Sequence, residues 1–410
     1  MSMAPPFVNP LQYVPPVYSA LRWRGIRSAL WNTVHETAEA TLQRAAERVQ
    51  QCYPAYQVLL TDSGTSALTL ALQGTADTLA ARRLVALPAY ACPDIATAAI
   101  GAGFSIMLYD VDPANFEPDL ASVEACLNAG ARHVVAVHLY GRLVDVPGVC
   151  NLAARYGATV IEDAAQHAGG TRNGVRGGAQ APVAILSFGR GKGLNAGGGG
   201  ALLQQQPVAH DAGAQQGVSS GLLRESRMAS LRGFSVAVMS ELLAHPWVYA
   251  LPANIPAFGI GRTRYQSPHP MHAMSPLLAS LLIDALESEP QLLAARRRHE
   301  HAYEQALEQH AQRRFDPPPP HVQSGALRYP VRITAYGDGG LPHQLARLGV
   351  ARSYPYHLAD YHAIRPHLVG ADRLLPGARA LAASTYTLPT HARITPDIRQ
   401  QIVAQLTQRP

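Results

Sequence analysis

The sequence predicts an α/β protein whose central sheet is mostly parallel. Short apolar runs rich in Val, Ile and Leu alternate with helical patterns between about residues 57 and 205. The chain has 410 residues, of which 47% are hydrophobic and only 15% charged, so it can bury a large core. In sheets of this kind, active-site residues gather at the carboxyl ends of the strands.

Each element follows from its own pattern. Seven apolar runs of six or seven residues predict strands, at 57–62, 83–89, 105–111, 133–139, 158–164, 183–189 and 200–205. Four segments with helical spacing lie between them, at 65–74, 94–103, 119–130 and 146–157. Alternation of the two kinds favours parallel strands joined by helical crossovers.

The rest of the chain is organised differently. Residues 206–270 contain an apolar insertion broken by prolines, which favours a dimer contact over a membrane-surface element. A long helix is expected from Ser275, with a break at Pro290. We therefore predict an N-terminal arm and a large α/β domain at 1–290, with the insertion inside it, and a smaller C-terminal α+β domain at 291–410.

Charge and cysteine content exclude several classes of protein. The net charge of +6 favours an anionic small-molecule substrate, but no arginine run with interleaved aromatic residues indicates nucleic acid. Arg296, Arg297 and Arg298 are expected on a solvated helix face. The four cysteines form no CxxC pair, so neither a metal site nor a disulfide framework is expected. Without a signal peptide or an 18-residue apolar run, the chain is expected in the cytoplasm, with no transmembrane segment.

One residue is conspicuous by its chemistry. Lys192 is the only lysine among the 34 Lys and Arg residues, and it lies in the glycine-rich segment LSFGRGKGLNAGGGGALL. Arginine can replace lysine wherever only positive charge is needed, but a guanidinium cannot lose its proton and attack a carbonyl. A single lysine could also remain by chance. The neighbouring motifs therefore have to distinguish a functional lysine from a chance one.

Two further motifs follow predicted strands. In TDSGTSALTLAL, backbone N–H groups and the hydroxyls of Thr65 and Ser66 meet at a helix start, which favours an anion there or an ordinary helix cap. TVIEDAAQHAGG ends a buried strand with Glu162 and Asp163. A buried carboxylate needs a partner, and a pyridinium nitrogen or a helix start would serve.

Taken in order, these motifs resemble the DegT/StrS family of sugar aminotransferases, which use pyridoxal 5'-phosphate (PLP) and have the fold-type I architecture. The resemblance runs from about Val58 to Leu203 and resumes weakly towards the C-terminus. Its pieces are SGTSAL, LPAYACPDIATAAIGAG, YDVDPANFEPD, VHLYGRLVDVPGV, IEDAAQHAGG, SFGRGKGLNAGGGG and LPTHARITPDIRQQIVAQL.

The resemblance implies a role for each matching residue. Lys192 would form the Schiff base with PLP, Asp163 would pair with the pyridine nitrogen, and Gln166 would lie near the cofactor hydroxyl. The cofactor phosphate would be held by Gly64, Thr65, Ser66 and Ser187. The family stacks an aromatic ring on the cofactor; here Cys92 falls at that position, and Tyr90, two residues earlier, is the alternative.

The sequence departs from the family in two places. An Asn-Tyr-Arg stretch, whose asparagine reaches the cofactor phosphate of the partner subunit, is replaced by Met271, His272 and Ala273, so His272 or His269 is the candidate substitute. The N-terminal segment also lacks the glycine-rich entry expected for a sugar nucleotide. Both departures concern substrate binding and assembly more than the cofactor.

The resemblance implies a homodimeric PLP-dependent aminotransferase with shared active sites. It would move an amino group, from glutamate, to a keto-sugar that is nucleotide-linked. Two alternatives remain: a PLP enzyme acting on another amino acid or on a non-sugar ketone, and a non-catalytic homologue that binds PLP or a sugar nucleotide. An NAD-dependent enzyme is the least supported alternative, because its only evidence is the G-x-G-x-x-A match at 191–196.

Overall fold

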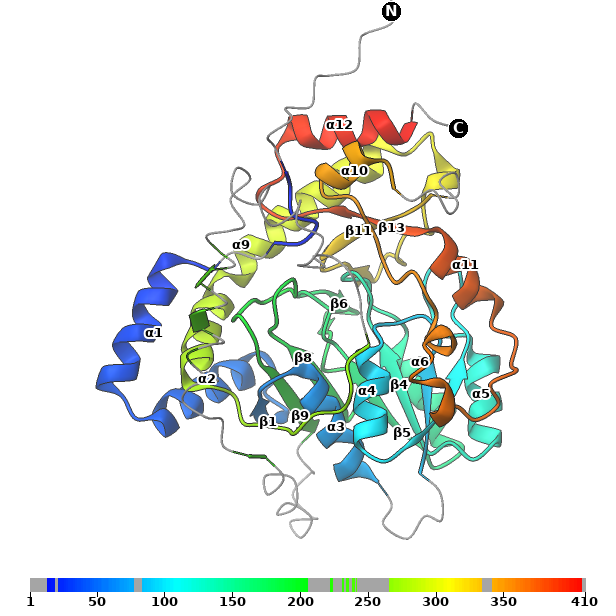
Figure 1. Cartoon of the computed structure of the whole chain (residues 1–410), viewed down its shortest axis with the longest axis horizontal. Coiled ribbons are helices and arrows are strands. Elements are labelled where there is room, and N and C mark those ends of the chain that lie inside the picture. Colours follow the sequence, from blue (N-terminus) through cyan, green and yellow to red (C-terminus); the bar gives the residue numbers. More distant parts are fainter. Residues whose placement is uncertain are drawn as a thin grey trace, which may run out of the picture.

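The computed structural model describes residues 13–18, 21–76, 83–205, 265–333 and 341–407, together with eight single positions between 222 and 241. Its centre is a seven-stranded sheet in the order β1-β9-β8-β5-β4-β2-β3 (Figure 1). The strands are β1 Tyr56–Thr61, β2 Leu84–Pro88, β3 Ser105–Tyr109, β4 His133–Val137, β5 Thr159–Asp163, β8 Val183–Ser187 and β9 Gly200–Gln205.

The central sheet is parallel except for one strand. β8, β5, β4, β2 and β3 pair in parallel, and β9 runs antiparallel to both β8 and β1. The crossover helices are α3 Gly64–Thr75, α4 Asp94–Gly101, α5 Leu120–Asn128 and α6 Val146–Ala154. The predicted α/β fold with a mostly parallel sheet is therefore confirmed, strand by strand.

Long helices cover one flank of this sheet. α1 Trp23–His35 and α2 Ala38–Cys52 pack beside α9 Pro276–Ala306 (Figure 1). The break expected at Pro290 is wrong, because α9 runs through that proline. The neighbouring Glu289 is 6% exposed and forms an ion pair with Arg176, so packing offsets the hydrogen bond that proline cannot donate.

The C-terminal residues form a second, antiparallel sheet in the order β11-β13-β12. These strands are β11 Arg328–Arg332, β12 Ala351–Arg352 and β13 Thr385–Pro389, accompanied by α10 His343–Arg347, α11 Pro376–Ser384 and α12 Pro396–Thr407. A small sheet of β6 Thr171–Arg172, β7 Val175–Arg176 and β10 Val322–Gln323 joins the two regions. The domain division at 290 stays a prediction, and it falls inside α9.

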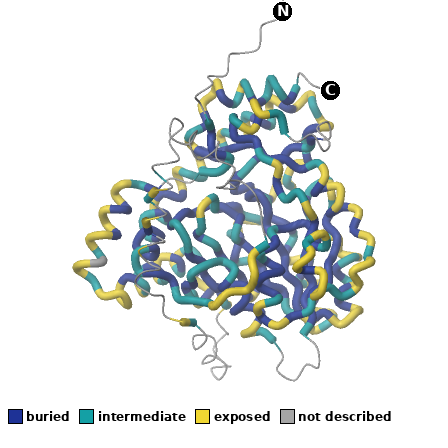
Figure 2. The backbone as a smooth tube through the Cα atoms, viewed as in Figure 1, coloured by how far each residue is buried: buried dark blue, intermediate teal, exposed yellow. Residues whose placement is uncertain are grey.

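Burial follows this architecture. Buried residues gather along the central strands, whereas the outer side of α1 is exposed (Figure 2). Val14 packs in the C-terminal core together with Tyr303 and Tyr329, so the N-terminal segment is tied to the other end of the chain. Most of the predicted insertion at 206–270 lies outside the described residues, and so does its expected dimer contact at 229–261.

Candidate active site

Three strand ends bring the predicted residues to one edge of the central sheet. β5 ends at Asp163 and β8 at Ser187, while Gly200 at the start of β9 lies opposite both Ser187 and Thr61. Since β9 is antiparallel, its first residue joins the carboxyl ends of its neighbours. The glycine at 200 is required, because a Cβ there would lie 2.5 Å from the Ser63 backbone.

The start of α3 lies directly against this edge. Ser63 caps the helix by accepting from the Ser66 backbone N–H at 3.1 Å, and its hydroxyl also bonds the Ser66 hydroxyl at 3.0 Å. A Cβ on Gly64 would come 2.8 Å from the Ser187 Cβ, so only glycine lets the helix start approach Ser187 so closely. The arrangement points free backbone N–H groups and the positive helix end towards one small region.

Asp163 and Lys192 are electrostatically coupled. Asp163 is 6% exposed and accepts a hydrogen bond from the Ala165 backbone at 2.9 Å. Burial raises the pKa of its carboxyl, while the Ala165 bond and the Lys192 charge lower it. The charge of the only lysine in the sequence therefore acts on a buried carboxylate at the end of β5, and an acid perturbed in this way is typical of a functional site.

The two acids at the end of β5 have separate environments. Glu162 is fully buried, pairs with His138 Nε2 at 2.7 Å, and accepts from the backbone of Gly178 at 2.6 Å and Gln180 at 2.8 Å. The Val144 N–H donates to His138 Nδ1 at 3.2 Å, which places the ring hydrogen on Nε2. Glu162 therefore stabilises the sheet edge, and Asp163 is the carboxylate whose pKa the Lys192 charge lowers.

The glycine-rich loop is held by an arginine of α9. Arg296 is 4% exposed, and its guanidinium donates to the carbonyls of Gly193 at 2.5 Å and Ala168 at 3.3 Å. A Cβ on Gly193 would lie 2.4 Å from the Ala168 Cα, so the two segments are in direct backbone contact. The expected solvated face is thus wrong for Arg296, although Arg298 is exposed. An arginine run alone carries no signal that distinguishes the buried member.

The two candidates for the ring-facing position lie in different surroundings. Tyr90 is fully buried, and its hydroxyl lies 2.9 Å from that of Tyr140. Cys92 is half-buried; burial raises the pKa of its thiol to about 12, and the Lys192 charge acts in the opposite direction. Cys92 is therefore within electrostatic reach of Lys192, whereas Tyr90 packs among other tyrosines.

Gln166 connects the sheet edge to the C-terminal region. Its Oε1 accepts from the Tyr140 backbone at 3.2 Å, and its Nε2 donates to the Tyr354 hydroxyl at 2.7 Å. Tyr354 stacks against Tyr140 with ring centroids 6.5 Å apart. Sequence reasoning missed Tyr354, because a lone tyrosine in a loop gives no pattern that ties it to a residue 188 positions earlier.

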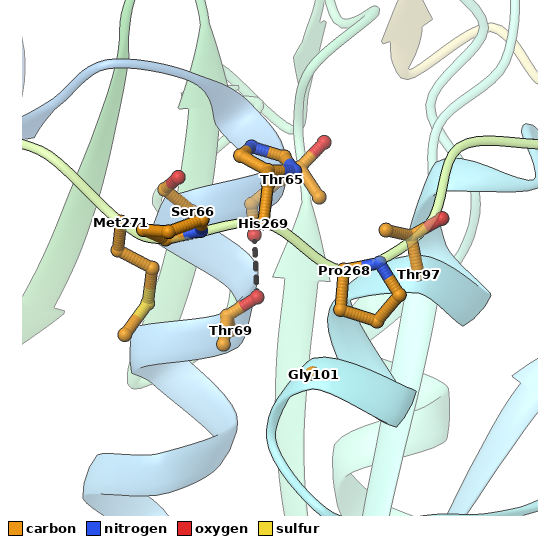
Figure 3. A pocket seen from close by; sticks show the side chains of 9 residues that line it. Thr65, Ser66, Thr69, Thr97, Gly101, Pro268, His269 and Met271 are labelled. Carbon is orange, nitrogen blue, oxygen red and sulfur yellow. Dashed lines mark hydrogen bonds between the residues drawn. The ribbon is translucent and has the colours of Figure 1, made fainter.

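Thr65, Ser66 and His269 line a pocket of about 230 Å³ between α3 and α4 (Figure 3). Its other lining residues are Thr69, Thr97, Gly101, Pro268, Pro270 and Met271. His272 lies beside it, and its carbonyl accepts from the Asp62 backbone at 2.9 Å. Of the two predicted histidines, only His269 lines this pocket.

Two absences hold for the part of the chain that the structure describes. No group of three or more His, Cys, Asp or Glu side chains is arranged to hold a metal ion. Within the same residues, no helix is both long and apolar enough to cross a membrane.

Several known proteins are similar in sequence. Residues 33–235 match the DegT/DnrJ/EryC1/StrS aminotransferase family. UDP-N-acetyl-3-dehydro-alpha-D-glucosamine 3-aminotransferase of Acidithiobacillus ferrooxidans is 34% identical over 145 residues, which are 34% of this chain and 38% of that protein. L-glutamine:2-deoxy-scyllo-inosose aminotransferase of Streptomyces kanamyceticus is 29% identical, over 45% of this chain and 43% of the relative. The chain thus spans less than half the length of these two relatives. GDP-perosamine synthase of Caulobacter vibrioides is 27% identical over 85% of this chain and 84% of its own length.

Solved structures show the same fold. The sugar aminotransferase CalS13 from Micromonospora echinospora superposes with a TM-score of 0.73 at 18% identity, covering 97% of this chain and 100% of the other. Helicobacter pylori PseC, an aminotransferase involved in the biosynthesis of pseudoaminic acid, gives 0.74 at 15% identity, with 97% and 99% covered. The motifs around Lys192, the matched residues and this fold agree: over residues 33–235 the chain is similar to the DegT/DnrJ/EryC1/StrS aminotransferase family.

Proposed function

We propose that the protein is a PLP-dependent aminotransferase that moves an amino group from glutamate to a nucleotide-linked keto-sugar. The observation that carries this proposal is the convergence of the buried Asp163, Ser187 and the start of α3 at the carboxyl edge of the sheet, where the Lys192 charge also lowers the pKa of the Asp163 carboxyl. A primary amine beside a buried carboxylate supplies the two groups that a pyridine aldehyde needs, one for its carbonyl and one for its ring nitrogen.

The residues present fit that cofactor. A side chain at position 64 would collide with Ser187. Because Gly64 has none, backbone N–H groups and the Ser187 hydroxyl can both approach a phosphate there. Thr65 and Ser66 would add to this cradle, with Ser66 already engaged by Ser63. Gln166 would face the cofactor hydroxyl, and Cys92 rather than Tyr90 would lie against the ring, because Cys92 is the one that Lys192 influences.

Each group then has a chemical task. When bound, PLP supplies an electron sink for the carbon from which a proton is removed. Asp163 would hold a proton on the ring nitrogen and so keep that sink effective. The Lys192 Nζ would hold the cofactor by its carbonyl and, once the donor amine has displaced it, its free amine would accept the proton from the donor Cα. Arg296 keeps the backbone next to Lys192 in place through the Gly193 carbonyl.

Relatives support the class of acceptor. Their names describe aminotransferases acting on a UDP-linked sugar and an inosose, and a GDP-perosamine synthase. The net charge of +6 suits an anionic, nucleotide-linked substrate. A screen of donors and acceptors that follows the visible absorbance of the purified protein would name both substrates.

Covalent trapping tests the proposal directly. Borohydride reduction should fix PLP to the amine that holds it, and the labelled peptide should contain GKGLNAGGGG, since Lys192 is the only lysine. The protein should be yellow before reduction and lose its colour afterwards. Bound PLP with this peptide unmodified would overturn the proposed mechanism.

We also propose a cytoplasmic homodimer with active sites shared between subunits. The support is the similarity to the family and the apolar sequence of segment 229–261, which favours burial on association. Sedimentation at micromolar concentration should give twice the chain mass of 43.9 kDa. A monomer that retains PLP and activity would contradict it.

A further inference from the structure

The outer side of α1 is exposed (Figure 2), and much of it is apolar. Trp23, Leu30, Trp31 and Val34 are 56%, 50%, 64% and 78% exposed. With 3.6 residues per turn, these positions fall within about 100° of one another around the helix axis, and Arg27 lies among them. Single exposed apolar residues are ordinary on a protein surface, but four that form one stripe indicate a surface that contacts something.

The opposite side of α1 is already packed against α9. Ile26 and Ala29 are buried in a core that also contains Leu282 of α9. Near the end of α1, the Asn32 Nδ2 donates to the Ser280 Oγ at 2.9 Å. The helix is thus held on the protein by its inner side, and the apolar outer stripe is not needed for that attachment.

The tryptophans of the chain are concentrated outside its core. The sequence has three. Trp23 and Trp31 lie on the exposed stripe, and Trp247 lies in the apolar segment 229–261, outside the described residues. Tryptophan combines a large apolar ring with a polar N–H, which suits the boundary between water and lipid. Two of them about two turns apart on one exposed helix face are typical of a helix that lies in a membrane interface.

The charges of α1 favour an anionic surface. The helix contains Arg24 and Arg27 but no aspartate or glutamate. Arg24 forms ion pairs with Asp284 and Glu287 of α9, so these neighbouring acids are already engaged. Arg27 is exposed within the stripe, and no ion pair to it is found in the part of the chain that the structure describes. A long arginine side chain can lie along apolar surface while its guanidinium reaches a phosphate.

We propose that α1 docks the protein on an anionic lipid surface, where Trp23, Leu30, Trp31 and Val34 enter the headgroup region and Arg27 contacts a lipid phosphate. A helix of this kind lies in the plane of the surface and binds through buried apolar area together with attraction to anionic lipids. The net charge of +6 adds to that attraction. This docking is separate from the proposed amine transfer and does not depend on it.

A second copy of the chain fits the stripe less well. Two-fold contact through the same face would bring Arg27 of one chain close to Arg27 of the other, and α1 offers no acid to neutralise them. A lipid surface meets the same stripe with phosphates, which attract the guanidinium. The composition of the stripe therefore favours lipid over self-association.

The test uses the PLP-loaded full chain and vesicles of phosphatidylcholine with or without phosphatidylglycerol. The fraction of protein that sediments with the vesicles gives the affinity. Leu30→Ser removes an apolar side chain that enters the lipid, so it should bind about tenfold more weakly. Arg27→Gln should bind about fivefold more weakly and depend less on salt. Leu374→Ser, at a leucine 84% exposed in the segment before α11, is the matched control and should bind as the wild type does.

Tryptophan emission reports whether the stripe enters the lipid. In Trp247→Phe, which keeps only Trp23 and Trp31, vesicles with phosphatidylglycerol should shift the emission to shorter wavelength. Vesicles of phosphatidylcholine alone should shift it much less. Wild-type protein that does not sediment with anionic vesicles, or equal binding by Leu30→Ser and Leu374→Ser, overturns the proposal.

Two further readouts separate this docking from the other proposals. If Leu30→Ser changes a dimer into a monomer while its binding to vesicles equals that of the wild type, the stripe is a contact between copies and the lipid proposal is wrong. Amine transfer without vesicles should be the same in the wild type, Leu30→Ser and Arg27→Gln. A wild-type protein that transfers no amine from any donor overturns the proposed function, whereas its binding to vesicles is judged by sedimentation alone.

Discussion

The central-sheet side of the candidate site and its C-terminal side hold their polar groups in different ways. On the central-sheet side, Asp163 and Gly64 are placed by a strand end and a helix start, and their contacts involve the backbone. On the C-terminal side, Tyr354 is placed by side chains, through Gln166 and the stack on Tyr140. The first side depends on regular structure, and the second on packing between distant segments.

This difference has a consequence for substitutions. A group placed by the backbone can be replaced without disturbing its neighbours, so its loss should change chemistry and leave folding intact. A group placed by other side chains shares its position with them, so its loss should have smaller effects spread over several properties. Four substitutions test this contrast.

Lys192→Arg should have the largest effect. The variant keeps the charge but cannot form the bond to the cofactor or carry the Cα proton, so kcat should fall by about 10⁴-fold or more. Amine transfer and the borohydride-stable label are measured together. Retention of either one in the variant would show that the charge alone is what the protein needs from Lys192.

Asp163→Asn should come second. The amide cannot hold the ring nitrogen protonated, and loss of one such electrostatic group corresponds to about 10²- to 10³-fold in kcat. The melting temperature should change little, because the Ala165 N–H keeps an oxygen acceptor. Absorbance measures PLP content and stopped-flow the rate; near-normal turnover would mean that Asp163 has another partner.

Arg296→Gln should have an intermediate effect that combines stability with rate. It removes hydrogen bonds to the Gly193 and Ala168 carbonyls, which should lower the free energy of unfolding by about 2–3 kcal/mol. The Lys192 loop should loosen, with kcat about tenfold lower. Arg298→Gln, two residues away and exposed, is the control and should stay within about 0.5 kcal/mol. Equal denaturation midpoints for the two variants would exclude the proposed clamp.

Tyr354→Phe should have the smallest effect. It removes only the hydroxyl that accepts from Gln166, so stability should fall by about 1 kcal/mol and kcat a few-fold. Tyr356→Phe, at a side chain that is 55% exposed, is the matched control. If Tyr354→Phe were as inactive as Asp163→Asn, the contrast between the two sides of the site would be wrong.

The sequence was most informative where the physics is local. Apolar runs and turns locate the strand ends at Asp163 and Ser187 and the helix start at Gly64, as the structure has them, whereas the cofactor roles of these residues follow only from the resemblance and stay predictions. Predictions failed where an interaction joins distant segments. Arg296 looked solvated and Pro290 looked like a helix end, since neither pattern contains the partners that bury the one and offset the other.

The sequence by itself determined the α/β fold, the positions along the chain where the central strands end, and the single lysine that can act as an amine. Periodicity and residue chemistry are properties of neighbouring residues, so they need no three-dimensional information. Only the tertiary structure decided that Glu162 pairs with His138, that Arg296 is buried against the glycine-rich loop, and that Gln166 donates to Tyr354. These outcomes depend on which side chains fill the space around a residue, and that space is formed by segments up to 188 positions apart.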